Sequence, residues 1–231
     1  MSVIAIITAR GGSKRIPKKN IKEFYGKPML AYAIEAAQKA NIFDEIMVST
    51  DSYEIADVAK KYGAAVPFMR SEKTSNDFAT TYDVLEEVVS EYQKIGKKFD
   101  NICCIYPCVP FLTSKTLNES FEIFIEEHYN ALQPVCAYST PIEWAMRLSD
   151  GLLIPDSPEK LTIRSQDLKK AYFDVGMFYY CKTEVMLREK TLVPNKTAGF
   201  VIDESECQDI DTPDDWKMAE LKYKLLEASN L

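Results

Sequence analysis

The first strand and the loop after it constrain the fold more than any other part of the sequence. Residues 3–8 read Val-Ile-Ala-Ile-Ile-Thr, an unbroken apolar or β-branched run. Such a run is typical of a strand covered on both faces, as in a parallel sheet between two helical layers. A basic, glycine-containing loop follows directly. We therefore expect an α/β protein whose first loop lies at the carboxyl end of a buried strand, where ligands of such sheets bind.

Strand-like and helix-like segments alternate along the rest of the chain. Further strands are predicted at 45–49, 101–106, 131–138, 173–181 and 199–203. Helices are predicted at 28–40, 53–62 (ending at Gly63), 81–95, 114–127 and from Pro213 onward, with Thr212 as its N-cap. This order indicates a mostly parallel sheet with helices on both faces. Residues 139–172 break the rhythm, and we expect them to form a hairpin, lid or dimerisation arm inserted in one domain spanning 1–231.

Charge is divided unevenly along the chain. The formal net charge is −7 at pH 7, so the chain lacks the overall basic character of a general nucleic-acid binder. Residues 1–22 nevertheless contain six Lys or Arg and no acid, whereas residues 203–215 contain seven Asp or Glu and no base. This asymmetry predicts two halves of one site, the first suited to an anion and the second to a cation.

Cysteine and histidine usage excludes several kinds of site. The six cysteines include no C-x-x-C pair and lie mostly in apolar runs, which predicts buried free thiols and no zinc site. The only histidine, His128, falls at a predicted helix end and is expected on the surface. The sequence shows no signal peptide and no apolar run of membrane-spanning length. We expect a cytoplasmic protein with no membrane or nucleic-acid partner.

The basic loop has the chemistry of an anion site. Gly11 and Gly12 remove side chains, so that backbone N–H groups can approach an anion closely. The cations around them would repel one another unless an anion or acids neutralise them. The loop matches neither G-x-x-x-x-G-K-[ST] nor G-x-G-x-x-G, and the alternative interpretation is a solvated basic loop.

Two acids near the C-terminus have the chemistry of a metal site. Asp209 and Asp211 are two residues apart, so on an extended segment their side chains point to the same side. Mg²⁺ takes one or two carboxylates together with phosphate oxygens and water. The alternative is that these acids mark a helix start, which accounts for Asp214 and Asp215 but not for Asp209.

The order of these motifs resembles that of a known family. The loop Arg10-Gly-Gly-Ser-Lys14-x-x-Pro17-x-Lys19-Asn20 is similar to the signature loop of the nonulosonic-acid cytidylyltransferases, which include the CMP-sialic acid synthetases. Similar segments follow in the same order at Val48–Asp51, Pro67–Arg70 and Asp209–Pro213. Segments Cys104–Leu112, Arg164–Leu168 and Ala171–Tyr179 resemble the pseudaminic acid branch. Sialic-acid enzymes usually carry Gln-Pro in place of Tyr106-Pro107, and Met177 stands where the pseudaminic branch has Gln.

The resemblance implies a fold, a reaction and a set of residues. The fold is Rossmann-like, of the nucleotide-diphospho-sugar transferase type, and the reaction joins CTP to the anomeric hydroxyl of a nonulosonic acid, releasing pyrophosphate. Mg²⁺, or Mn²⁺ in its place, would be held by Asp209 and Asp211. Arg10, Lys19 and Asp211 would be catalytic. The nucleotide would be bound by Arg10, Gly11, Gly12, Ser13, Lys14, Lys19, Asn20 and Arg70.

The sugar side of the site is less sharply indicated. Arg164 could pair with the acceptor carboxylate, and Gln166, Tyr172 and Asp174 could bind its hydroxyl and acetamido groups. Asp174 is also a candidate to accept the hydroxyl proton, with a metal-bound hydroxide as the alternative. The competing interpretations are a structural Arg164–Asp167 ion pair and a core or interface role for Tyr172.

Several functions stay open at this point. The acceptor could be pseudaminic acid, N-acetylneuraminate, legionaminate or Kdo. A nucleotide-sugar glycosyltransferase is disfavoured because its Asp-x-Asp usually follows a mid-chain strand, whereas here it lies near the C-terminus. A non-catalytic nucleotide-binding domain would be expected to lack some of Arg10, Lys19, Asp209 and Asp211, and all four are present. We also expect a homodimer formed through residues 139–172.

Overall fold

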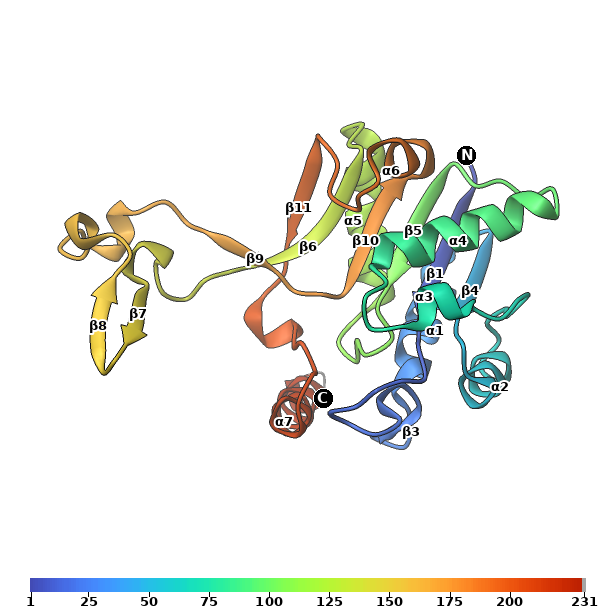
Figure 1. Cartoon of the computed structure of the whole chain (residues 1–231), viewed down its shortest axis with the longest axis horizontal. Helices are drawn as coiled ribbons and strands as arrows, with labels where there is room; N and C mark the ends of the chain where they lie inside the picture. Colours follow the sequence, from blue (N-terminus) through green and yellow to red (C-terminus); the bar gives the residue numbers. More distant parts are fainter. Residues whose placement is uncertain (230–231) are drawn as a thin grey trace.

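The core of the protein is one mixed sheet of seven strands, seen in a computed structural model that describes residues 1–229 (Figure 1). Its order is β11 (Thr197–Val201), β6 (Ala131–Ala137), β10 (Phe178–Lys182), β5 (Asn101–Ile105), β1 (Val3–Thr8) and β4 (Glu45–Ser49). A short strand, β9 (Tyr172–Asp174), pairs with the end of β6. The apolar run at 3–8 thus forms an interior strand, with β5 and β4 on either side of it.

Most strands of this sheet run in one direction. β1 is parallel to β4 and β5, and β11 is parallel to β6. β9 and β10 run the other way, because the chain leaves the carboxyl end of β6 for the arm and returns without a crossover helix. The predicted mostly parallel sheet is confirmed, with β9 and β10 as its antiparallel strands.

Helices cover both faces of the sheet, as predicted. They are α1 (Met29–Ala40), α2 (Tyr53–Lys61), α3 (Glu72–Ser75), α4 (Thr81–Lys94), α5 (Ser114–Glu126), α6 (Thr183–Glu189) and α7 (Pro213–Ser229). Alternate side chains of β1 point to the two helical layers. Ala5 and Ile7 pack in the cluster that holds α1 and α5, whereas Ile4 and Ile6 pack in the cluster that holds α4.

Two strand predictions need correction. The segment 173–181 is not one strand but two, β9 and β10, because Gly176 adopts a φ of +64° that an extended strand does not allow. The last strand lies at Thr197–Val201 rather than 199–203. The short elements α3, α6, β2 (Glu23–Phe24) and β3 (Lys27–Pro28) were not predicted.

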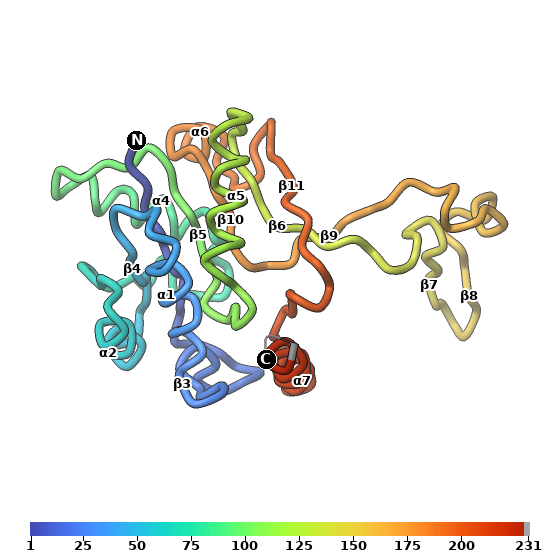
Figure 2. The backbone as a smooth tube through the Cα atoms, turned by 180° about the vertical axis from the view of Figure 1, so that it is seen from behind, coloured from blue at the N-terminus to red at the C-terminus, as the bar shows by residue number. Residues whose placement is uncertain are grey.

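Residues 139–171 form an arm that projects from one edge of the sheet (Figures 1 and 2). The arm holds the hairpin of β7 (Met146–Ser149) and β8 (Leu152–Pro155) with short 3₁₀-helices at Ile142–Trp144, Pro158–Lys160 and Ser165–Asp167. Leu148, Leu152 and Leu153 are 66–72% exposed. The hairpin predicted as one option for this segment is therefore present, and it leaves large apolar side chains uncovered in the single chain.

The cysteines and the histidine lie where the sequence predicted them. All six cysteines are free, and five are buried. His128 follows α5 on the surface, with its backbone in the left-handed region at φ 53°. Within residues 1–229, no helix combines the length and apolarity needed to cross a bilayer.

Candidate nucleotide-binding site

A pocket of about 520 Å³ opens at the carboxyl end of β1, as expected for a sheet of this type. Five cations and two acids line it, so its charge is predominantly positive. The cations are Arg10, Lys14, Arg15, Lys19 and Arg70, and the acids are Asp77 and Asp211. Ser13 and Asn20 also line the pocket, and so do Thr81 and Tyr106.

The basic loop is held in shape by bonds within the chain. Gly11 donates its backbone N–H to Asp51 Oδ1 at 2.7 Å, and a Cβ there would lie 3.1 Å from Ser52 Cβ. Asn20 is buried and donates to the Arg10 carbonyl at 2.8 Å, while its Oδ1 accepts from the Cys108 thiol at 3.3 Å. Gly11 thus serves a close approach, and both ends of the Asn20 amide position the loop.

Two of the predicted phosphate-binding residues lie outside the pocket. Gly11 and Gly12 are not part of its wall, and the Gly11 N–H is already bonded to Asp51. The Ser13 N–H likewise bonds to the Gly11 carbonyl at 3.0 Å. The positive charge of the pocket therefore comes from side chains rather than from glycine N–H groups.

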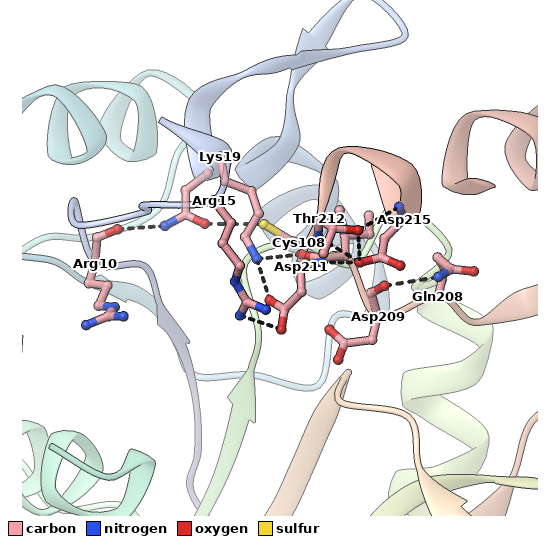
Figure 3. A network of polar contacts seen from close by, with 11 residues as sticks. Arg10, Arg15, Lys19, Cys108, Gln208, Asp209, Asp211, Thr212 and Asp215 are labelled. Carbon is pink, nitrogen blue, oxygen red and sulfur yellow. Dashed lines mark hydrogen bonds and ion pairs between the residues drawn. The ribbon is translucent and has the colours of Figure 1, made fainter. Parts of the chain in front are cut away.

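Asp211 joins the basic start of the chain to its acidic near-end (Figure 3). Its Oδ2 accepts from Arg15 Nη2 at 2.7 Å, and its Oδ1 lies 3.3 Å from Lys19 Nζ. Lys19 Nζ also donates a short bond to the Ile210 carbonyl. The Lys19 side chain is only 20% exposed, which holds its ammonium group at a defined point of the pocket. The two oppositely charged segments therefore do meet, as their composition predicted.

The start of α7 holds Asp211 in place. Thr212 Oγ1 accepts from the Asp215 N–H at 3.2 Å, and Asp215 Oδ2 accepts from the N–H groups of Thr212 and Asp211. These reciprocal bonds are a capping box, which confirms Thr212 as the N-cap. The bonds from Thr212 lower the pKa of Asp215. Asp215 is therefore a helix-entry acid, as predicted, and Asp211 is not.

Asp209 has the chemistry of a cation ligand. Partial burial, and then the charge of Asp211, raise the pKa of its carboxyl group. Among the side chains that the structure describes, none donates a hydrogen bond to that carboxylate, and no dashed line reaches it in Figure 3. Partial burial and a neighbouring charge of the same sign are features that a divalent cation would relieve.

The pair Asp209 and Asp211 suits Mg²⁺ only with help from a ligand. No group of three or more His, Cys, Asp or Glu that could hold a metal is found within the described part of the chain. Two carboxylates are what Mg²⁺ commonly takes from a protein when phosphate oxygens and water complete its shell. The donor set therefore fits a magnesium ion that arrives with a phosphate compound.

Arg70 is the buried cation of the pocket. It is 8% exposed, donates from Nε to Ser49 Oγ at 3.0 Å, and donates from Nη2 to the Ser49 carbonyl at 2.7 Å. Burial lowers its pKa, and the charges of Asp51 and Glu87 oppose that effect. These bonds fix the orientation of Arg70 at the pocket wall.

Asp77 was not predicted from the sequence, yet it contacts two predicted phosphate ligands. Its Oδ1 accepts from Arg10 Nη1 at 2.8 Å, and its Oδ2 accepts from Lys14 Nζ at 2.6 Å. The segment that carries it has no helical or strand periodicity, so nothing in the sequence pointed to this contact. Arg15, counted in the basic run but given no role, likewise contacts Asp211.

The predicted sugar-binding residues lie outside this pocket. Arg164 and Gln166 belong to the arm, and Arg164 Nε bonds to Asp167 Oδ2 at 3.0 Å, the structural pair that the sequence left open. Tyr172 is 45% exposed on β9. Asp174 accepts from the Gly176 N–H at 2.8 Å and from Tyr179 Oη at 2.7 Å.

Tyr106 connects this region to the pocket. Its hydroxyl lies 3.1 Å from Thr81 Oγ1, and its ring centroid lies 5.4 Å from that of Tyr179. Tyr179 in turn donates to Asp174, so a chain of side chains runs from β9 to the pocket wall. Tyr106 is thus a residue of the pocket wall that was noted in a family motif but given no role.

Comparison with known proteins identifies the family. Residues 4–211 match the family model described as "Cytidylyltransferase", which covers both the basic loop and Asp211. The chain belongs to the cytidylyltransferase family. Cytidylyltransferases are nucleotidyltransferases, and this cytidylyltransferase has both halves of the pocket within the matched range.

Two curated relatives and one solved structure support the assignment. The chain is 38% identical to a pseudaminic acid cytidylyltransferase of Campylobacter jejuni, over 97% of both chains. It is 33% identical to a CMP-N,N′-diacetyllegionaminic acid synthase of Legionella pneumophila, over 98% of this chain and 97% of the relative. A CMP-2-keto-3-deoxy-manno-octonic acid synthetase complexed with CTP has the same fold, with a TM-score of 0.71, 18% identity and full coverage of both chains.

Proposed function

We propose that this cytidylyltransferase joins CTP to the anomeric hydroxyl of pseudaminic acid, giving the CMP-sugar and pyrophosphate. The observation that carries the proposal is the cationic pocket closed by Asp211, in a chain that is 38% identical to a pseudaminic acid cytidylyltransferase across its length. The 33% identity to a legionaminic acid enzyme makes legionaminic acid the second candidate acceptor.

The side chains of the pocket suit this reaction. The acceptor oxygen attacks the α-phosphorus and the bond to pyrophosphate breaks, so negative charge stays on phosphoryl oxygens throughout. Arg10, Lys14 and Lys19 line the pocket with N–H donors for those oxygens. Catalysis is then mainly a matter of positioning and charge neutralisation by groups already in place. We expect Arg70, whose guanidinium group is fixed by Ser49, to contact the nucleoside part.

Asp209 and Asp211 would hold the magnesium ion. When bound, Mg²⁺ supplies charge neutralisation and orientation of the phosphate chain. Asp211 also orients Lys19 and Arg15, so its substitution would disturb both the cations and the metal site. Asp209 makes no such contact within residues 1–229 and is the cleaner probe of the metal.

The acceptor is tested by measuring pyrophosphate release. CTP is supplied with Mg²⁺ and a panel of pseudaminic, legionaminic, N-acetylneuraminic and Kdo acids, and kcat/KM is compared across the panel. We expect pseudaminic acid to give the highest value. A higher value for another acid would replace the acceptor, and no release with any acid would contradict the proposed reaction.

We propose that the arm binds a second copy of the chain to form a homodimer. Its hairpin exposes Leu148, Leu152 and Leu153, and exposed apolar clusters of this kind mark interaction sites. Arg164 and Gln166 do not line the pocket of their own chain. In the dimer, we expect Arg164 of the partner subunit to lie at the sugar side of the site, where a carboxylate-binding cation is needed.

A single charge on the hairpin tests the dimer. Leu148 and Leu153 are cross-strand neighbours, so Leu148→Asp would bury a charge in the interface and is expected to shift the protein from dimer to monomer mass. Light scattering at micromolar concentration measures the mass. The control is Ser90→Asp, which adds the same charge at an exposed position of α4, outside the arm. A wild-type protein of monomer mass would contradict the dimer.

We also propose that the enzyme works in the cytoplasm. Its six cysteines are all free, which fits a reducing compartment. Fractionation of the source cells, followed by detection of the protein in each fraction, tests this placement.

A further inference from the structure

Asp77 is an acid of the pocket wall that pairs with two of the pocket cations. It lies between α3 and α4, and its two carboxylate oxygens are divided between Arg10 and Lys14. The distances are 2.8 Å to Arg10 Nη1 and 2.6 Å to Lys14 Nζ. Both cations belong to the set that the proposed function assigns to the phosphates of CTP. Asp77 therefore makes the same kind of contact that a phosphate oxygen would make.

The contacts of Asp77 are charged but exchangeable. Hydrogen bonds from Lys14, and then from Arg10, hold the pKa of Asp77 below its ordinary value, so the carboxylate is ionised at neutral pH. The Asp77 side chain is 48% exposed, and those of Arg10 and Lys14 are 40% and 78% exposed. Ion pairs this open to solvent are weak individually and are screened by salt.

The surrounding backbone keeps this carboxylate at the pocket. Asn76 Oδ1 accepts from the N–H groups of Phe78 and Ala79, at 2.8 and 3.0 Å, which closes a turn around Asp77. Thr80 then begins α4 with a capping box to Asp83. Rotation of the Asp77 side chain is thus enough to break both ion pairs without a change in the turn, while Arg10 Nη1 keeps a longer bond, of 3.3 Å, to the Asn76 carbonyl.

We propose that Asp77 is an internal counter-anion of the phosphate-binding side chains, which the phosphate oxygens of a bound nucleotide displace. The inference rests on the proposed function, because it takes Arg10 and Lys14 as phosphate ligands. Asp77 adds a fixed cost to the binding of every phosphate compound. A ligand with several phosphates recovers that cost through its further contacts with the pocket, whereas a single phosphate does not.

The alternative role for Asp77, orienting the two cations, predicts the opposite change in phosphate binding. If Asp77 only oriented Arg10 and Lys14 for the nucleotide, its removal would weaken phosphate binding. If it competes with phosphate, its removal strengthens phosphate binding, because an acid is taken away and two cations are left without a counter-charge.

The experiment measures the binding of inorganic pyrophosphate by calorimetry, in the presence of a metal chelator. The proteins are the wild type, Asp77→Asn, Asp77→Ala and the control Glu54→Gln. Glu54 pairs with Lys18 of the same basic loop at 2.7 Å, and neither residue lines the pocket. Thermal melts verify that all four proteins are folded.

We expect both Asp77 variants to bind pyrophosphate about 3- to 10-fold more tightly than the wild type, with Glu54→Gln unchanged. The gain should shrink as salt is raised. Unchanged or weaker binding by both Asp77 variants overturns the inference while leaving the proposed function intact. No pyrophosphate binding by any of the four proteins overturns the proposed function together with the inference.

Discussion

Replacing Lys19 by alanine is expected to lower kcat by about 100- to 1,000-fold and to leave the fold intact. The Lys19 ammonium group lines the pocket, lies 3.3 Å from Asp211 and is largely shielded from solvent. A donor fixed in advance where phosphoryl charge is stabilised contributes far more than one that solvent can replace. Pyrophosphate release with saturating CTP measures the effect.

The adjacent lysine provides a matched control. Lys18 carries the same charge on the same loop, but it pairs with Glu54 and lies outside the pocket. Lys18→Ala should therefore keep kcat close to that of the wild type, and both variants should melt near the wild-type temperature. Near-normal turnover by Lys19→Ala would remove this residue from the catalytic set.

Removing the divalent cation should abolish turnover, and adding Mg²⁺ or Mn²⁺ should restore it. Asp209→Asn should raise the Mg²⁺ concentration for half-maximal activity by about 10- to 100-fold or more, because it removes a charged ligand and keeps the side-chain shape. A titration of activity against Mg²⁺ measures the shift for each variant.

The control for Asp209 is a solvent-exposed acid of the same terminal segment. Asp214 pairs with Lys217, and its side chain is 89% exposed. Asp214→Asn should leave the Mg²⁺ titration unchanged. Turnover that persists in excess chelator would exclude Asp209 and Asp211 as ligands of an essential metal.

Much of the fold could be predicted because buried strands and helices have a regular pattern of apolar residues in the sequence. β1 and β4 were predicted at their observed bounds, since both lie in the buried sheet and read as short apolar runs. The apolar pattern does not indicate the direction of a strand in the sheet. That β10 runs against β5 depends on how the chain returns from the arm, and the break between β9 and β10 depends on the backbone of one glycine.

The site was predictable where a motif and its place in the fold coincide. Lys19 and Asp211 meet because one follows an interior strand and the other precedes a capped helix. Asp77 could not be predicted, because its role arises only when a turn from mid-chain is folded against the first loop. Arg164 could be identified as a polar residue of the arm, but not as one that lies outside the pocket of its own chain.

The bond between Arg15 and Asp211 joins residues 196 positions apart. A ribosome making this chain releases the first strand and its loop long before it reaches the acid that completes the pocket. Contacts of such long range form late in folding, because the intervening chain must be ordered first. The pocket is therefore closed only after almost the whole described chain has been made. A chain cut short before Asp211 would keep the basic loop and lack the acid that pairs with Arg15 and Lys19.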